Sequence, residues 1–324
     1  MPVLEYYFIY MIMEVFKNIR AAWQRSPRLC TLPLMCGLMA IINGCVSKDA
    51  AKDMANFSRA VALTASNSAS AYQLVEHEHF EAQFSDTVLN YDGGLFKPAF
   101  LPFLTPDQVR LRLDVFEGLR IYAARLSALM STSLTNLDSD TTKLGNNLSS
   151  INQDLVQASF VKTASVSTND VLIFTAGVNA LGHLIATLRE QKACKEAITR
   201  MQAHMPGICG VFEKDLDVMR NQLANDYEEQ KRNSTLYLKA NFAKLAPFQV
   251  RAELQRLTML ANAKKTAEDA LAGTKASVEK LDAAHRALDK AFTKDKNGLA
   301  SLISAVSDEA HQVSSYYNSL QTNN

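Results

Sequence analysis

The chain has 324 residues, 48% of them hydrophobic and 21% charged, and its 34 Lys and Arg against 33 Asp and Glu give a formal net charge of +1. The balance persists without residues 1–44, which hold four of the bases and two of the acids, because residues 45–324 then carry 30 bases and 31 acids. This balance gives no electrostatic reason to expect nucleic acid or anionic lipid as a partner. Ala and Leu are by far the most frequent residues and β-branched alternation is scarce, so we expect an all-α protein.

An export signal is indicated at the N-terminus. Arg25 and Arg28 precede an uncharged run, residues 29–44, whose 16 residues are short for a membrane-spanning helix. A basic flank, a short apolar core and a small residue before the cut are typical of a secretory signal. The run ends in Ile42-Asn43-Gly44-Cys45, which resembles the lipobox of bacterial lipoproteins.

The resemblance implies a diacylglycerol thioether-linked to Cys45, cleavage before it, and in many bacteria a third acyl chain on the new N-terminus. The membrane, reached through this lipid anchor, is then a partner, and no other cofactor is expected. In enterobacterial lipoproteins Asp after the acylated Cys favours the inner membrane. Val46 stands there, so we expect an outer-membrane protein facing the periplasm, if the source is Gram-negative. Three alternatives stay open. The segment is a signal anchor with an incidental cysteine, the leader is cut at another position, or translation starts at Met11 or Met13 instead of Met1.

The sequence therefore divides into a signal peptide (1–44), a lipidated tether (45–51) and one helical domain (52–324), because no flexible linker interrupts the last part. We expect an elongated bundle of six to eight long antiparallel helices. The first is predicted over residues 52–90, where apolar residues recur at helical spacing. Its expected inner face consists of Phe57, Val61, Thr64, Ala71, Tyr72 and Val75.

An apolar loop follows at residues 95–105, with three phenylalanines and two prolines in eleven residues. One interpretation is a loop folded onto the end of the bundle, where it covers the core. The other is an exposed hydrophobic tip that docks a partner or the membrane. Its candidate contact residues are Phe96, Phe100, Leu101 and Phe103.

Two helix starts are well marked. Thr105 to Gln108 form a capping box with Pro106 at the first helical position, and residues 167–170 form another start. The first of these helices has a stripe of Val115, Leu119, Tyr122, Leu126 and Leu129, and after a polar turn the spacing continues at Leu144, Leu148, Ile151 and Leu155.

Residues 171–188 form the most hydrophobic segment after the leader, and they carry no charge. A helix that is apolar on all sides belongs in the centre of a bundle or in a bilayer, and we favour the core. Its main stripe is Val171, Phe174, Val178, Leu181, Ile185 and Leu188.

The C-terminal third predicts further helices. A helical hairpin is expected to turn at Met205-Pro206-Gly207, a helix restarts at Pro247, and Gly273 permits another corner. The expected inward residues are Val250, Leu254, Leu257 and Leu260, then Val278, Leu281, His285, Leu288 and Phe292, and finally Ile303, Val306, Ala310, Val313 and Tyr317.

Two cysteines, Cys194 and Cys209, follow the lipidated one in a compartment where disulfides persist. They flank the predicted corner, and straight helices would leave their sulfurs offset by roughly 12 Å, beyond disulfide reach unless a helix frays. Two alternatives therefore stay open: a Cys194–Cys209 disulfide, or two buried thiols.

No pattern indicates catalysis: there is no Gly-x-Ser-x-Gly, no glycine-rich phosphate loop and no nucleophile with a supporting histidine. The densest group of donor residues, 76–81, places His77 and Glu81 on one helix face but turns His79 about 200° away from His77, so a zinc site lacks convergent ligands. His183 is interpreted as a hydrogen-bonded core residue and His285 as a seam residue that sets register. We predict no catalytic residues, no metal and a non-enzymatic protein.

The leading hypothesis is a lipid-anchored structural, scaffold or partner-binding spacer of the bacterial envelope, with an envelope protein as its unidentified partner. The alternative is a helical membrane-perturbing protein that inserts residues 171–188. A metal-dependent enzyme using His77, Glu81 and distant donors is the third hypothesis.

Overall fold

A computed structural model of the chain describes residues 48–91, 93, 99–131, 139–160, 166–190, 193–293 and 299–322, all within the compact unit Val46–Asn324. In those ranges it contains nine α-helices and no β-strand, which confirms the all-α class. The predicted leader and Cys45 lie outside the described residues. The longer helices are α2 (Lys48–Leu89), α3 (Pro106–Ser131), α6 (Thr168–Thr187), α8 (Met205–Asn241), α9 (Pro247–Thr293) and α10 (Leu299–Thr322); the shorter are α4 (Ser139–Ser149), α5 (Gln153–Phe160) and α7 (Cys194–Gln202).

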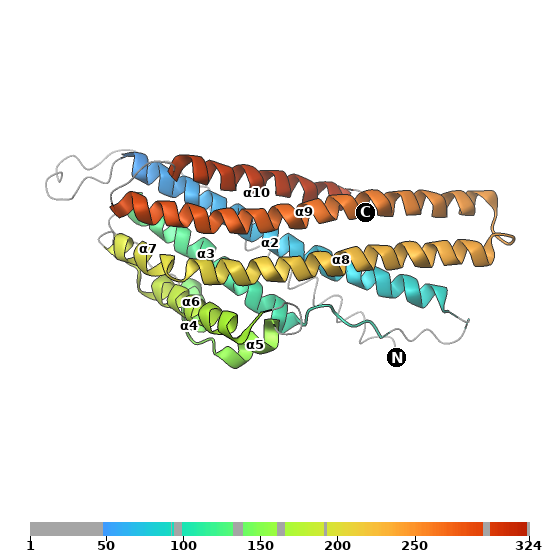
Figure 1. The fold of residues 1–324 in the computed structure, drawn as a ribbon, viewed down its shortest axis with the longest axis horizontal. Helices are drawn as coiled ribbons and strands as arrows, with labels where there is room; N and C mark the ends of the chain where they lie inside the picture. The colour runs from blue at the N-terminus through green and yellow to red at the C-terminus, as the bar shows by residue number, and fades with distance from the viewer. Residues whose placement is uncertain are drawn as a thin grey trace. The chain divides into compact units, whose positions relative to one another are not determined.

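The long helices α2, α8, α9 and α10 lie side by side and form the main bundle (Figure 1). α8 and α9 make an antiparallel hairpin, and α10 returns along α9. α2 runs parallel to α8, because Tyr72 bonds to Asp215 and, further along both helices, Ser85 bonds to Asn233. α2 begins at Lys48, so residues 48–51, which were predicted to belong to a tether, are helical.

A second layer is built around α6, which packs against α3, α4, α5, α7 and α8 (Figure 1). Its predicted stripe is buried throughout, from Val171 to Leu188. The opposite side is covered only in part, since Leu184 is buried whereas Leu172 and Ile173 are 41% and 42% exposed. α6 is therefore a core helix, as expected, but it lies at the edge of the fold and is not surrounded on all sides.

Most predicted apolar faces form the observed core. Every residue of the stripes predicted for α2, α3 and α10 is buried. Two helix starts also have the predicted caps: Gln108 and Thr105 bond to each other's backbone amides, and Ser167 and Asp170 form a second capping box. The helix expected to run from Leu144 to Leu155 is instead two, because the chain leaves α4 after Ser149, and Leu155 is exposed.

Glycine at two positions permits close helix packing. At the crossing of α4 and α6, a Cβ on Gly182 would meet the backbone oxygen of Gly145 at 2.6 Å and the backbone nitrogen of Ser149 at still shorter range. Gly273, predicted as a corner, lies inside the unbroken helix α9. A Cβ there would collide with Val313 of α10, so this glycine serves close approach and not a turn.

The predicted hairpin corner at Met205-Pro206-Gly207 was also wrong. α7 and α8 follow each other with only Ala203 and His204 between them, both in right-handed helical conformation, and Pro206 occupies the first turn of α8, where its missing N–H leaves no bond unmade. Cys194 and Cys209 thus lie on successive helices separated by several turns. Both are free, buried thiols in the structure, as in the second of the two alternatives.

One fully buried ion pair joins the two layers. The Arg112 guanidinium of α3 donates Nε–H and Nη2–H to the two oxygens of Asp215 on α8, each at 2.7 Å. Its remaining donors reach the carbonyl oxygens of Gln108 and Ser159 at 2.9 and 3.2 Å. Tyr72 of α2 donates its hydroxyl to Asp215 at 3.0 Å. Four helices, α2, α3, α5 and α8, therefore meet at one satisfied charge pair.

We expect Asp215→Ala to lower the free energy of unfolding by roughly 3–5 kcal/mol, because it leaves a buried guanidinium without its counter-charge. Urea denaturation followed by circular dichroism measures the loss. Glu196→Ala, which breaks an exposed pair with Arg200, is the control and should change stability by less than about 0.5 kcal/mol. Equal losses for the two variants would contradict a structural role for the buried pair.

The glycine packing gives a pair of substitutions with opposite expected signs. Gly182→Ala should destabilise by about 2 kcal/mol, because the new methyl group meets backbone that cannot rotate away. Gly210→Ala, inside α8 with no atom within 4 Å of the new Cβ, should stabilise by about 0.5–1 kcal/mol through helix propensity. Melting temperatures of both variants test this, and a stabilising Gly182→Ala would refute the close crossing of α4 and α6.

Candidate partner-binding surface

The apolar loop runs back along the C-terminal half of α2. Gln83 holds it by two bonds: its amide donates to the Leu101 carbonyl at 2.8 Å, and its side-chain oxygen accepts the Leu101 N–H at 2.9 Å. Glu76 accepts the N–H groups of Phe103 and Leu104 at 3.2 and 2.5 Å. Side chains of α2 thus supply the hydrogen-bond partners of the loop backbone, which has no neighbouring strand to supply them.

The loop is only partly covered. Leu104 is buried and Phe103 half-buried, whereas Leu101 is 71% exposed. Phe100 packs edge-on against Phe80 at a centroid distance of 4.8 Å, and Phe84 lies beside both. The interpretation as a covering loop holds for Phe103 and Leu104. Phe100 and Leu101 remain at the surface as the predicted contact residues, and Phe96 lies outside the described residues.

A polar seam between α2 and α8 lies directly beneath this loop. The His79 ring nitrogen Nδ1 is 3.1 Å from Asp226, and Gln222 donates to the same carboxylate at 2.8 Å. The hydrogen bond from Asp226 raises the pKa of His79, although partial burial opposes the rise. Burial raises the pKa of the neighbouring Glu76 carboxyl despite its two backbone bonds. This seam fixes α2 against α8, and sequence reasoning missed it because the partners are far apart in the chain.

The residues considered as metal ligands are not brought together. His77 is exposed, and His79 bonds to Asp226 of another helix. In the described part of the chain, no group of three or more His, Cys, Asp or Glu side chains is placed to hold a metal ion. His183 is exposed on α6, so the expectation of a core histidine there was wrong.

His285 is the buried histidine of the fold, and it does occupy the predicted seam. Its Nδ1 lies 2.8 Å from the side-chain oxygen of Gln202 on α7, and its Nε2 lies 3.1 Å from the Tyr122 hydroxyl of α3. A neutral ring can donate to the first and accept from the second, which satisfies both nitrogens. Burial lowers the pKa of His285 to about 4, so the ring stays neutral at physiological pH.

A second apolar surface lies at the free end of the α8–α9 hairpin. Not one of residues 235–266 is buried. Leu260 is half-buried and does pack against the core. Val250 and Leu257 are only half-buried, however, and Leu254 is 54% exposed, so the predicted inward face was wrong for their part of α9. The cause is length: α8 and α9 extend beyond the ends of α2 and α10 (Figure 1). The exposed large side chains here are Leu236, Phe242, Phe248, Leu254 and Met259.

The same end of the hairpin is basic. Residues 230–252 contain no Asp or Glu but five bases, namely Lys231, Arg232, Lys239, Lys244 and Arg251. The whole-chain balance of charge concealed this segregation, and a count over a short window would have revealed it.

No enclosed cavity marks a binding site within the ranges that the structure describes. The two best-formed hollows are shallow and open; one is lined by Lys195, Glu196, Thr199 and Arg200, the other by Asn225, Glu228, Glu229 and Arg232. Among the described helices, only α6 is long and apolar enough to cross a membrane, and half of its apolar window is buried in the fold. Protein-family models, curated proteins and solved structures give no match to the chain.

The buried His285 generates a prediction on acid stability. Its folded pKa of about 4 lies below the unfolded value of about 6.5, so the unfolded chain takes up the proton first as the pH falls. Stability from this residue is complete above pH 6.5 and is lost towards pH 4, by about 2–3 kcal/mol. His285→Gln can keep both hydrogen bonds without titrating. Urea denaturation between pH 7.5 and 4.5 should therefore show a shallower loss for the variant, and parallel curves would contradict the prediction.

Proposed function

We propose that the protein is a lipid-anchored spacer of the bacterial envelope, without catalytic activity, which carries a partner-binding surface away from its membrane. The proposal rests on one observation, that the start of α2 and the free end of the α8–α9 hairpin lie at opposite ends of the bundle (Figure 1). α2 begins at Lys48, three residues after the proposed lipid attachment at Cys45, and its 42 residues span about 63 Å. The free end of the α8–α9 hairpin lies at the opposite end of α2 (Figure 1).

The helix-rich core supports a rigid spacer. α8 and α9 have 37 and 47 residues, and their facing halves are tied by ion pairs such as Lys275–Asp217 and Lys264–Glu228, each at 2.7 Å. The surface offered to an envelope protein is the apolar patch of Phe80, Phe84, Phe100 and Leu101. The presence of Val46 after Cys45 favours the outer membrane, with the body in the periplasm.

The alternative of a membrane-perturbing protein keeps one observation in its favour, the length and apolar composition of α6. Its packing opposes insertion. Phe174 packs against the buried rings of Phe160 and Phe212, and moving α6 into a bilayer would leave these neighbours open to water, at roughly 1.5–3 kcal/mol for each large apolar side chain. Release of α6 therefore amounts to unfolding of the second layer, and the spacer is the better-supported function.

Replacement of the proposed lipid attachment site tests the proposal. We expect Cys45→Ser to retain the leader and to lack the acyl chains, because neither acylation nor the cleavage that follows it takes place. Mass spectrometry of the N-terminus measures both changes. The retained apolar leader itself holds the protein in the detergent phase, so the mass is the deciding measurement.

Cys36→Ser is the matched control, since a cysteine within the leader is removed on maturation and its loss should leave mass and partition unchanged. A Cys45→Ser protein with the mass of the wild type would overturn the lipid anchor.

A further inference from the structure

The free end of the α8–α9 hairpin has no partner within the described fold. Asn233 still bonds to Ser85 near the end of α2, at 3.1 Å, and Arg256 of α9 bonds to Ser234 of α8 at 3.0 Å. Past Ser85, α2 continues only to Leu89, and no residue of 235–266 is buried. We name residues 235–256 the hairpin tip.

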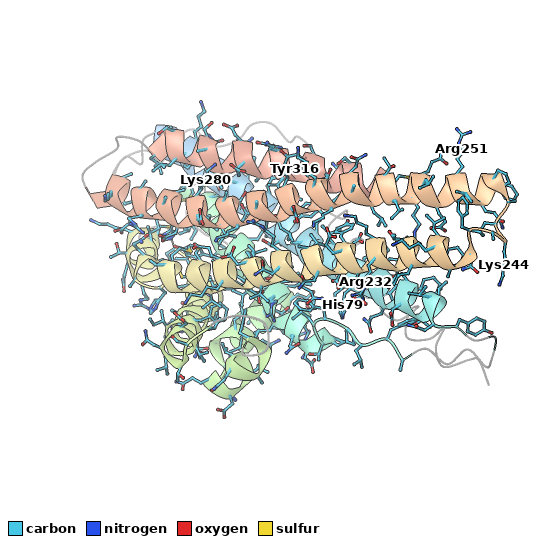
Figure 2. All side chains as sticks on the ribbon, turned by 45° about the vertical axis from the view of Figure 1, so that its right-hand side comes forward. His79, Arg232, Lys244, Arg251, Lys280 and Tyr316 are labelled. Carbon is cyan, nitrogen blue, oxygen red and sulfur yellow. The ribbon has the colours of Figure 1, made fainter. Side chains whose placement is uncertain are left out.

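The hairpin tip carries an excess of positive charge, and its exposed bases are not paired with acids of the described residues. One acid, Glu253, lies within the tip and is paired with Arg256, and the acid that precedes the tip in the sequence, Glu229, is paired with Arg232. Lys239, Lys244 and Arg251 are exposed, and no described carboxylate pairs with them. Figure 2 shows Lys244 and Arg251 at the free end, with the Arg251 side chain directed away from the hairpin.

Two exposed aromatic rings accompany these bases. Phe242 caps the end of α8 and is 67% exposed, and Phe248 in the first turn of α9 is 73% exposed. They flank the turn that contains Lys244. Exposed aromatic rings beside bases, without any acid between them, are the combination that binds the interface of anionic bilayers.

We infer that the hairpin tip docks on an anionic lipid bilayer, with Phe242 and Phe248 in the headgroup region and Lys239, Lys244 and Arg251 on lipid phosphates. A helical protein partner would need a continuous apolar stripe, whereas Leu254 lies about 120° around α9 from Phe248. A second copy of the tip would bring like charge to like charge. A fluid lipid surface requires neither a stripe nor a matched groove.

This binding activity extends the proposed spacer function but does not depend on the lipid at Cys45, because the tip residues alone carry it. Where the anchor is also present, the two ends of the bundle would hold two bilayers more than about 60 Å apart, because the hairpin tip extends beyond the end of α2 (Figure 1).

Vesicle clustering tests the inference with the full chain. The protein is reconstituted into phosphatidylcholine vesicles, its incorporation is verified by flotation, and a second population containing 30% phosphatidylglycerol is then added. Light scattering should report clustering of the two populations at low salt and its loss at 0.5 M NaCl, where charges are screened. Phosphatidylcholine alone as the second population should give none.

Three sets of substitutions locate the effect. Lys239→Gln, Lys244→Gln and Arg251→Gln together should weaken clustering on the order of a hundredfold, about fivefold for each base. Phe242→Ser with Phe248→Ser should weaken it about tenfold. The matched control, made at bases that are exposed elsewhere and lack a described ion pair, should leave it unchanged; it consists of Arg189→Gln, Lys195→Gln and Arg220→Gln.

The tip substitutions touch no buried residue, so melting temperatures should stay at the wild-type value. Absence of clustering by the wild type, equal clustering with uncharged vesicles, or an undiminished triple variant would each overturn the inference. Retention on polyglutamate beads without clustering would overturn it in favour of an acidic protein partner. If flotation shows no incorporation into phosphatidylcholine vesicles, co-flotation of the unanchored protein with the 30% phosphatidylglycerol vesicles measures binding by the tip alone, with the same variants and the same expected losses. The lipid at Cys45 is tested separately, by the mass of the N-terminus.

Discussion

The paired charges of Arg112 and Asp215 set the constraint on which the fold depends. A guanidinium and a carboxylate that are both excluded from water are tolerated only when nearly every donor and acceptor is used, and here the partners come from four helices. The Phe160 ring covers the guanidinium at 4.1 Å and removes the last access for solvent. A sliding of α3 along α8 by one turn would break the pair. The interaction therefore fixes the register between the main bundle and the second layer.

Polar contacts play the same role elsewhere in the main bundle. Asn67 of α2 donates to the Ala310 carbonyl of α10 at 2.7 Å, and Thr274 of α9 bonds to Tyr317 of α10 at 3.0 Å. Apolar stripes of Leu, Val and Ala permit several registers at similar free energy, whereas each buried polar contact is satisfied in one only. The hairpin tip has no such contacts to other helices, which is why it can present its side chains to the surroundings.

The sequence predicted those features that local pattern controls. The stripes of α2, α3, α6 and α10 and the caps at Thr105 and Ser167 were right, because spacing and capping chemistry act within a few residues. Gly273 and Pro206 were misjudged, since glycine also permits close packing and proline also begins helices. Leu254 was placed inward because its spacing is helical. Whether such a face is covered depends on the lengths of α2 and α10, and those lengths are not local information.

The parallel course of α2 and α8 has a consequence for how the chain acquires its structure. α2 is the first of the described helices to be synthesised, yet Tyr72 meets its partner 143 residues later and Asn67 meets its own 243 residues later. Closing loops of that size is entropically unfavourable, and contacts this distant in sequence slow folding. Until α8 and α10 emerge, the apolar face of α2 stays uncovered. A chain of this topology that crosses a membrane in extended form would need a chaperone that holds α2 until α10 arrives.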